Sequence, residues 1–86
     1  MSSTLTGIVT HYYDRISVAV ISLQGTIKVG DTVHFFGRIT DFQQEVQSMQ
    51  IEHEPIHQAQ QGQEVALKVN RRVRPRDKVY LIEGEE

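Results

Sequence analysis

The chain has 86 residues, a formal net charge of −2, 38% hydrophobic and 23% charged residues, and no cysteine. This composition excludes a disordered tail, a disulfide-stapled scaffold and a thiolate metal site. No apolar run approaches the roughly 20 residues of a membrane helix, and the first residues lack the basic and apolar regions of a signal peptide. We therefore expect one cytoplasmic domain over residues 1–86, with its core at about 6–82.

Two strand-like segments open the chain. Residues 6–13 are rich in β-branched and aromatic side chains, and Asp14-Arg15 suits a turn. Residues 16–23 alternate between apolar and small or polar side chains. The pattern predicts one face with Ile16, Val18, Val20 and Leu23, and an opposite face with Ser17, Ala19 and Ser22.

Three turn signals then punctuate the chain, and each is followed by a strand-like run. The signals are Val29-Gly30-Asp31, Gln61-Gly62-Gln63 and Arg74-Pro75-Arg76-Asp77. Gly and Pro supply the turn geometry, and Asp can hydrogen-bond to the backbone of its own turn. The runs that follow predict strands at residues 32–36, 63–69 and 78–82.

A further strand is expected at about residues 40–52, with an inward face that switches from Phe42 and Val46 to Met49 and Ile51. A bulge or corner near Gln47-Ser48 would produce that switch. Pro55 ends the strand, and residues 56–62 suit one short helical turn. Six strands without a convincing helix predict an all-β fold, a sandwich or a closed barrel.

Six of the nine basic residues fall within eleven positions: Lys68, Arg71, Arg72, Arg74, Arg76 and Lys78. Their side chains could contact RNA phosphates, with the two lysines flanking the arginines on neighbouring strands. The alternative is a solvated connection whose charges protect strand edges from aggregation. Stacking of bases has little support, because most of the aromatic residues available for it are expected in the core; they are Tyr12, Tyr13, Phe35, Phe36, Phe42 and Tyr80.

No catalytic or metal site emerges from the remaining polar residues. His53-Glu54-Pro55-Ile56-His57 fits the His-Glu-x-x-His zinc signature, but that motif requires a helix and Pro55 prevents one from including His53. The serines lie in strand-like runs without a sharp nucleophile turn. The expectation is a protein that is not an enzyme and has no cofactor and no metal.

The order of these motifs resembles the second domain of translational GTPases. The resemblance rests on Gly7-Ile8-Val9, on Gly25-Thr26-Ile27-Lys28-Val29-Gly30-Asp31-Thr32-Val33, and on residues 45–69 with Val46, Ser48 and His53. It implies a single closed six-stranded antiparallel β-barrel like domain 2 of elongation factor Tu, in a stand-alone elongation factor-like protein.

The chain also departs from that family. It has no Gly-x4-Gly-Lys-Ser/Thr phosphate loop, so GTP binding is not expected. Gln50 stands where an acidic residue would line the acceptor-end pocket of the tRNA-carrying factors. Arg76 replaces the usual Gly before Asp77, and Pro75 then predicts a type I turn, which needs no Gly.

Two functions follow as hypotheses. The first is a non-catalytic binding module of translation type that contacts RNA or the ribosome through the six cations. The alternative is a protein-interaction accessory for a partner enzyme, such as a collagenase-like peptidase of an RNA-modification system, because a similar barrel is appended to some of these peptidases. Neither hypothesis involves a membrane.

Overall fold

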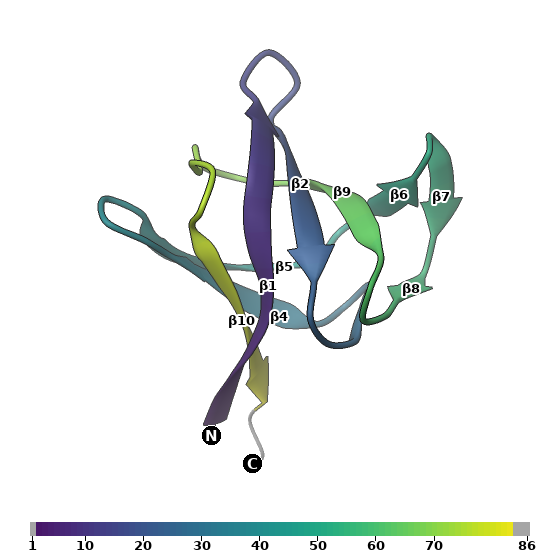
Figure 1. Cartoon of the computed structure of the whole chain (residues 1–86), viewed down its shortest axis with the longest axis horizontal. Helices are drawn as coiled ribbons and strands as arrows, with labels where there is room; N and C mark the ends of the chain where they lie inside the picture. Colours follow the sequence, from purple (N-terminus) through teal and green to yellow (C-terminus); the bar gives the residue numbers. More distant parts are fainter. Residues whose placement is uncertain (1, 84–86) are drawn as a thin grey trace.

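The computed structural model describes residues 2–83, which form ten strands (Figure 1). This part of the chain contains no helix, and hence none that is long and apolar enough to cross a membrane. The strands are β1 (Ser2–Tyr13), β2 (Val18–Leu23), β3 (Ile27–Lys28), β4 (Thr32–Phe36), β5 (Asp41–Glu45), β6 (Met49–Ile51), β7 (Glu54–Ile56), β8 (Gln58–Ala59), β9 (Glu64–Lys68) and β10 (Lys78–Glu83).

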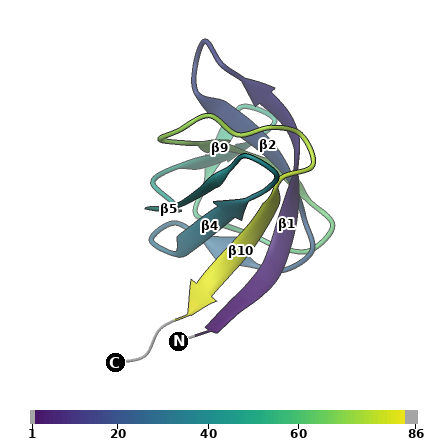
Figure 2. The ribbon, with the colours of Figure 1, turned by 90° about the vertical axis from the view of Figure 1, so that its left-hand side faces the viewer.

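Eight of the strands form one antiparallel sheet in the order β5-β4-β10-β1-β2-β9-β6-β7, while β3 pairs with β8. The long strand β1 lies at the centre and pairs with both β10 and β2. Its register shifts between Leu5 and Gly7 and again between Val9 and His11. Such irregularities bend a strand, and Figures 1 and 2 show the sheet curling around the core.

The curled sheet does not close into the expected six-stranded barrel. Within residues 2–83 its edge strands, β5 and β7, are not paired with each other. One side chain partly spans the gap: the Gln44 amide of β5 donates to the Lys68 carbonyl (2.9 Å) and accepts from the Asn70 N–H (2.7 Å). This amide, which is buried, therefore links β5 to the backbone at the end of β9. The all-β antiparallel prediction is confirmed, and the closed barrel is not found.

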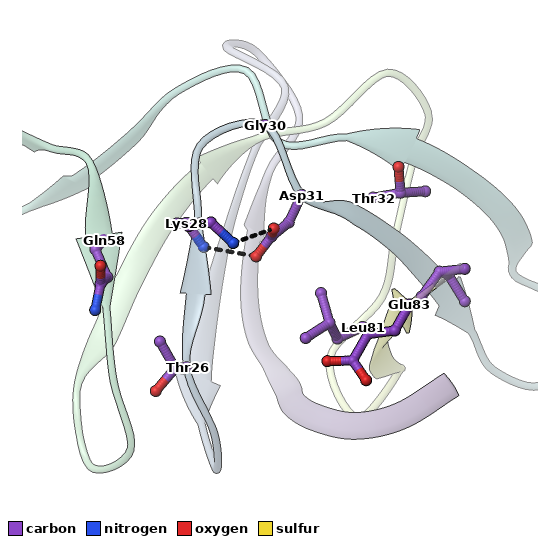
Figure 3. A pocket seen from close by; sticks show the side chains of 9 residues that line it. Thr26, Lys28, Gly30, Asp31, Thr32, Gln58, Leu81 and Glu83 are labelled. Atoms are coloured by element: carbon purple, nitrogen blue, oxygen red, sulfur yellow. Dashed lines mark hydrogen bonds and ion pairs between the residues drawn. The ribbon is translucent and has the colours of Figure 1, made fainter. Parts of the chain in front are cut away.

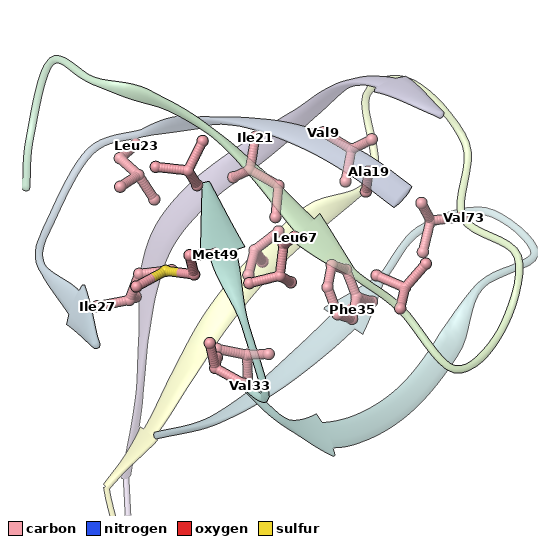
Figure 4. Close-up of a cluster of buried hydrophobic side chains, with 14 of the residues drawn as sticks. Val9, Ala19, Ile21, Leu23, Ile27, Val33, Phe35, Met49, Leu67 and Val73 are labelled. Carbon is pink, nitrogen blue, oxygen red and sulfur yellow. The ribbon is translucent and has the colours of Figure 1, made fainter. Parts of the chain in front are cut away.

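The core lies inside this curl and is almost entirely aliphatic (Figure 4). Phe35, Ile21, Met49 and Leu67 are among its largest fully buried side chains. Phe35 stacks on Phe42 with ring centroids 5.1 Å apart. Apolar burial of this kind is the main favourable contribution to folding, and it reaches every long strand of the sheet.

In β2 the predicted division of residues between the two faces is wrong for Leu23, which shares the buried face with Ala19. Ala19, Ile21 and Leu23 are buried, whereas Val18 and Val20 are only half-buried and Ile16 is exposed. Both parities of this segment carry apolar residues, so alternation alone does not identify the inner one. Pairing with β1 and β9 decides it, because a one-residue shift of register would turn every side chain to the other face.

The segment expected as one strand at 40–52 is two strands, β5 and β6, separated by residues 46–48. The predicted switch of the inward face is confirmed, since Val46, the first residue of the break, and Met49, the first residue after it, are both buried. The helical turn expected at 56–62 is wrong. These residues instead end β7 and form β8, which pairs with β3 through Ile27 and Ala59.

Candidate interaction site

Three turns of this molecule share one construction. In the turns at residues 28–31, 60–63 and 74–77, the fourth N–H donates to the first carbonyl at 3.0–3.1 Å. The side chain of the fourth residue (Asp31, Gln63 or Asp77) returns to accept from the first N–H at 2.8–2.9 Å. The predicted role of the two aspartates is confirmed, and Gln63 has the same role without a sequence signal that singled it out.

The third residue of each turn has a positive φ: 100° at Gly30, 93° at Gly62 and 82° at Arg76. This is the value that a type II turn requires at that position, whereas a type I turn has a negative φ there. The type I turn predicted at residues 74–77 is therefore wrong. Arg76 occupies a conformation that the two other turns leave to glycine.

The connection between β9 and β10, residues 69–77, is held against the sheet, and we call it the basic strap. Val69 donates to the Ser17 carbonyl at 2.9 Å, and Arg76 donates to the Val9 carbonyl at 2.7 Å. Three residues of the strap itself are buried: Val69, Val73 and Asp77. The strap is thus a fixed segment, and its exposed arginines are presented from a defined backbone.

The strap crosses the end of the sheet near the β1–β2 connection (Figure 1). The six predicted site residues, Lys68, Arg71, Arg72, Arg74, Arg76 and Lys78, are all exposed. None of them takes part in the ion pairs recorded among residues 2–83. In the sheet, β1 and β2 lie between β9, which carries Lys68, and β10, which carries Lys78. The expectation that the two lysines lie on neighbouring strands is wrong.

The structure joins two of these cations to residues that sequence reasoning missed. Arg76 and Lys78 line a pocket of about 500 Å³ with Phe36, Gly37 and Arg38 at the tip of the β4–β5 hairpin, and we call it the hairpin pocket. Lys78 is the register partner of Phe36. Gly37 lies so close to the Asp77 carboxylate that no Cβ would fit between them. The hairpin and the turn at residues 74–77 are therefore packed together.

Phe36 is an exception among the aromatic residues, most of which were expected in the core: its side chain is 48% exposed, and nearby Ile39 is 67% exposed. Phe35 is buried, so Phe36 must point to the opposite face of β4. The ring of His34 meets Phe36 edge-on at 6.1 Å, and His34 Nε2 lies 2.6 Å from Asp41 Oδ1. The alternation of the strand contained this signal, although it could not reveal the approach of Arg38 to Arg76.

A larger pocket of about 770 Å³ lies at the other end of β4 (Figure 3). Two of its charged lining residues, Lys28 and Asp31, are paired with each other. Lys28 Nζ lies 3.0 Å from Asp31 Oδ1, and the Lys28 N–H donates to Asp31 Oδ2. These contacts build the turn at residues 28–31. The Lys-Val-Gly-Asp motif is therefore explained by local structure.

A third pocket of about 500 Å³ lies on the outer face of β2, β6 and β9. Gln50, Glu52, His53, Glu64 and Tyr13 are among its lining residues. Glu52 and His53 have φ values of 51° and 68°, which belong to the tight turn between β6 and β7. His53 therefore lies in a turn and not on a helix. Among residues 2–83 no group of three side chains could hold a metal ion.

Comparison with known proteins places the domain in a family. A family model described as the Peptidase family U32 C-terminal domain matches residues 2–79. The chain belongs to this family. An uncharacterized protease of Methanocaldococcus jannaschii is 42% identical over 77 residues, which are 88% of this chain and 19% of the relative. A collagenase of Porphyromonas gingivalis is 30% identical over 77 residues, 87% of this chain and 21% of the relative.

Solved structures agree with this assignment. The chain is similar to the C-terminal domain of a Geobacillus thermoleovorans protein described as a U32 peptidase, with a TM-score of 0.87 and 25% identity over 93% of both chains. The selenomethionine variant of that domain gives a TM-score of 0.83 and 27% identity, over 87% of this chain and 95% of the other. The chain spans about a fifth of the length of the curated relatives it matches.

These matches overturn the resemblance to domain 2 of the translational GTPases. The family and its relatives are U32 peptidases, and they lend no support to an elongation factor-like role or to RNA or ribosome binding. Two of the segments that suggested translation factors, residues 25–33 and 45–69, contain or reach the turns at residues 28–31 and 60–63 described above. Turn geometry of this kind recurs in unrelated β-folds because it depends on glycine and aspartate chemistry.

Proposed function

We propose that this chain is a non-catalytic accessory domain of the U32 peptidase type, which binds protein and carries out no reaction itself. One observation carries the proposal: residues 2–79 match the C-terminal domain of these peptidases. The relatives are about five times longer than the matched region. In this proposal the catalytic residues belong to that remaining portion, here called the catalytic part.

The surface of the domain supports a binding role. The exposed cations of the basic strap, together with Lys68 and Lys78, are proposed contact residues. They extend from a backbone that is fixed by hydrogen bonds to Ser17 and Val9. A rigid support of this kind lowers the entropy cost of forming an interface. The cytoplasmic location expected from the sequence belongs to the same proposal, and cell fractionation would test it.

A domain exchange in the Porphyromonas gingivalis collagenase tests the proposal. Three proteins are compared: the intact enzyme, the enzyme without its matching C-terminal region, and the enzyme with this chain in its place. We expect deletion to slow collagen cleavage by about tenfold or more, and the exchange to restore it to within roughly threefold of the intact enzyme.

Circular dichroism of the deletion protein is the control, because loss of activity counts only while the catalytic part stays folded. Two results would overturn the proposal. One is full activity of the folded deletion protein, and the other is collagen cleavage by this 86-residue chain alone.

A further inference from the structure

Among the residues that line the hairpin pocket, Arg76 is the one with a strained backbone conformation. Its φ of 82° is the conformation that Gly30 and Gly62 adopt at the same position of the two other turns. A side chain in this region is strained, whereas glycine is not. Residues that are held in such conformations are concentrated at functional sites. The observation therefore directs attention to what the Arg76 side chain does in the pocket.

Arg76, Arg38 and Lys78 bring three positive charges to one pocket. Among residues 2–83 the carboxylates within ion-pair distance of a basic side chain are Asp31, beside Lys28, and Asp41, beside His34, so none of the three cations has a carboxylate partner there. Two acids lie nearby: Asp77 is buried and accepts from the Arg74 N–H at 2.8 Å, and Asp41, the register partner of Phe36, lies 2.6 Å from His34 Nε2. Neither carboxylate is among the lining residues of the pocket, whose charged side chains are all cations.

Apolar surface lies beside these charges. Phe36 lines the pocket, and Ile39 at the tip of the same hairpin is one of the most exposed large apolar residues. Arginine and aromatic side chains are enriched in the cores of protein interfaces. The exposed aliphatic side chain of Ile39 beside these cations fits a protein segment with an apolar side chain better than it fits the sugar-phosphate backbone of a nucleic acid.

We propose that the hairpin pocket binds an acidic segment of a protein, in which carboxylates flank an apolar side chain. The carboxylates would pair with Arg38, Arg76 and Lys78, and the apolar side chain would pack on Phe36 and Ile39. This inference rests on the proposed function, since the catalytic part of a U32 peptidase is the protein expected to supply the segment.

A titration of the isotope-labelled chain followed by nuclear magnetic resonance tests this contact. The probe is a synthetic peptide of six glutamates around one central leucine. We expect saturable shifts of the backbone signals of residues 36–39 and 76–78, and binding that weakens several-fold between about 50 and about 300 mM sodium chloride. Absence of saturable binding, or shifts confined to other residues, would overturn the inference.

Two variants separate loss of contact from loss of fold. Arg76→Gly removes a cation and also relieves the backbone strain, so it should bind roughly fivefold or more weakly while its melting temperature rises. Phe36→Ser should weaken binding to a similar extent. Lys28→Met removes the same charge at the other end of β4 and should leave binding unchanged. Equal weakening by Lys28→Met would show that only net charge matters and would reject the site.

Hexauridylate, a short single-stranded RNA, tests whether the hairpin pocket prefers a nucleic acid to the acidic peptide. Tighter binding of hexauridylate than of the acidic peptide would overturn the inference in favour of a nucleic-acid contact. The exchange enzyme described above distinguishes the two proposals. If it needs this domain but tolerates Arg76→Gly and Phe36→Ser, the hairpin pocket is wrong and the accessory function stands. If deletion of the domain has no effect, the accessory function fails, and the peptide titration then tests the pocket by itself.

Discussion

The turns at residues 28–31 and 74–77 have the same hydrogen bonds but lie at opposite ends of β4. The first has Gly30 at its positive-φ position and pairs its lysine with its own aspartate. The second has Arg76 at that position and buries its aspartate, while its cations face the hairpin pocket. The first turn is explained by the requirements of the fold. In the second turn, the strained backbone of Arg76 lies beside the exposed cations of the hairpin pocket. Strain of this kind is expected where binding is favoured at the expense of stability.

The largest effect that this comparison predicts is the loss of the buried aspartate. Asp77→Ala removes the acceptor of the part-buried Arg74 N–H and the packing against Gly37, and should lower the free energy of unfolding by about 2–3 kcal/mol. Asp31→Ala removes an exposed bond of the same kind and should cost about 1 kcal/mol. Urea unfolding of both variants measures the difference. Equal losses would show that burial does not distinguish the two turns.

An opposite sign is expected at the third position of the turns. Arg76→Gly relieves about 1–2 kcal/mol of left-handed strain but adds unfolded-chain entropy, so the net gain in stability should be about 0.5–1 kcal/mol. Gly30→Ala is the matched reverse change. A Cβ at Gly30 would meet no atom within 4 Å, so its expected loss of about 1 kcal/mol reflects the backbone alone. A loss of stability in Arg76→Gly would mean that Arg76 makes contacts that outweigh its strain.

The sequence predicted the features of this fold that depend on local chemistry. Gly30, Gly62 and Pro75 marked the turns, and Asp31 and Asp77 the bonds that close them. The same locality explains the wrong family, because a turn motif reports a backbone geometry that many β-folds share.

Features that depend on pairing over long separations were not predictable from the sequence. The inner face of β2 follows from its register with β1 and β9. The hairpin pocket follows from the pairing of Phe36 with Lys78, which brings Arg38 to Arg76 across 38 positions. The contact of β5 with the end of β9 also joins distant segments, since the Gln44 side chain bonds to the backbone of Lys68 and Asn70.

The smallest effect is expected from loss of the lysine side chain in the turn at residues 28–31. Lys28→Met removes the Lys28–Asp31 ion pair and keeps the bond from the Lys28 N–H to Asp31 Oδ2. Because the lysine side chain is 63% exposed, solvent and salt screen the pair, and the free energy of unfolding should change by less than about 0.5 kcal/mol. Urea unfolding at low and high sodium chloride measures this change, with Asp31→Ala as the reference. A loss as large as that of Asp31→Ala would mean that the ion pair holds the turn, and the two turns would then differ in construction as well as in exposure.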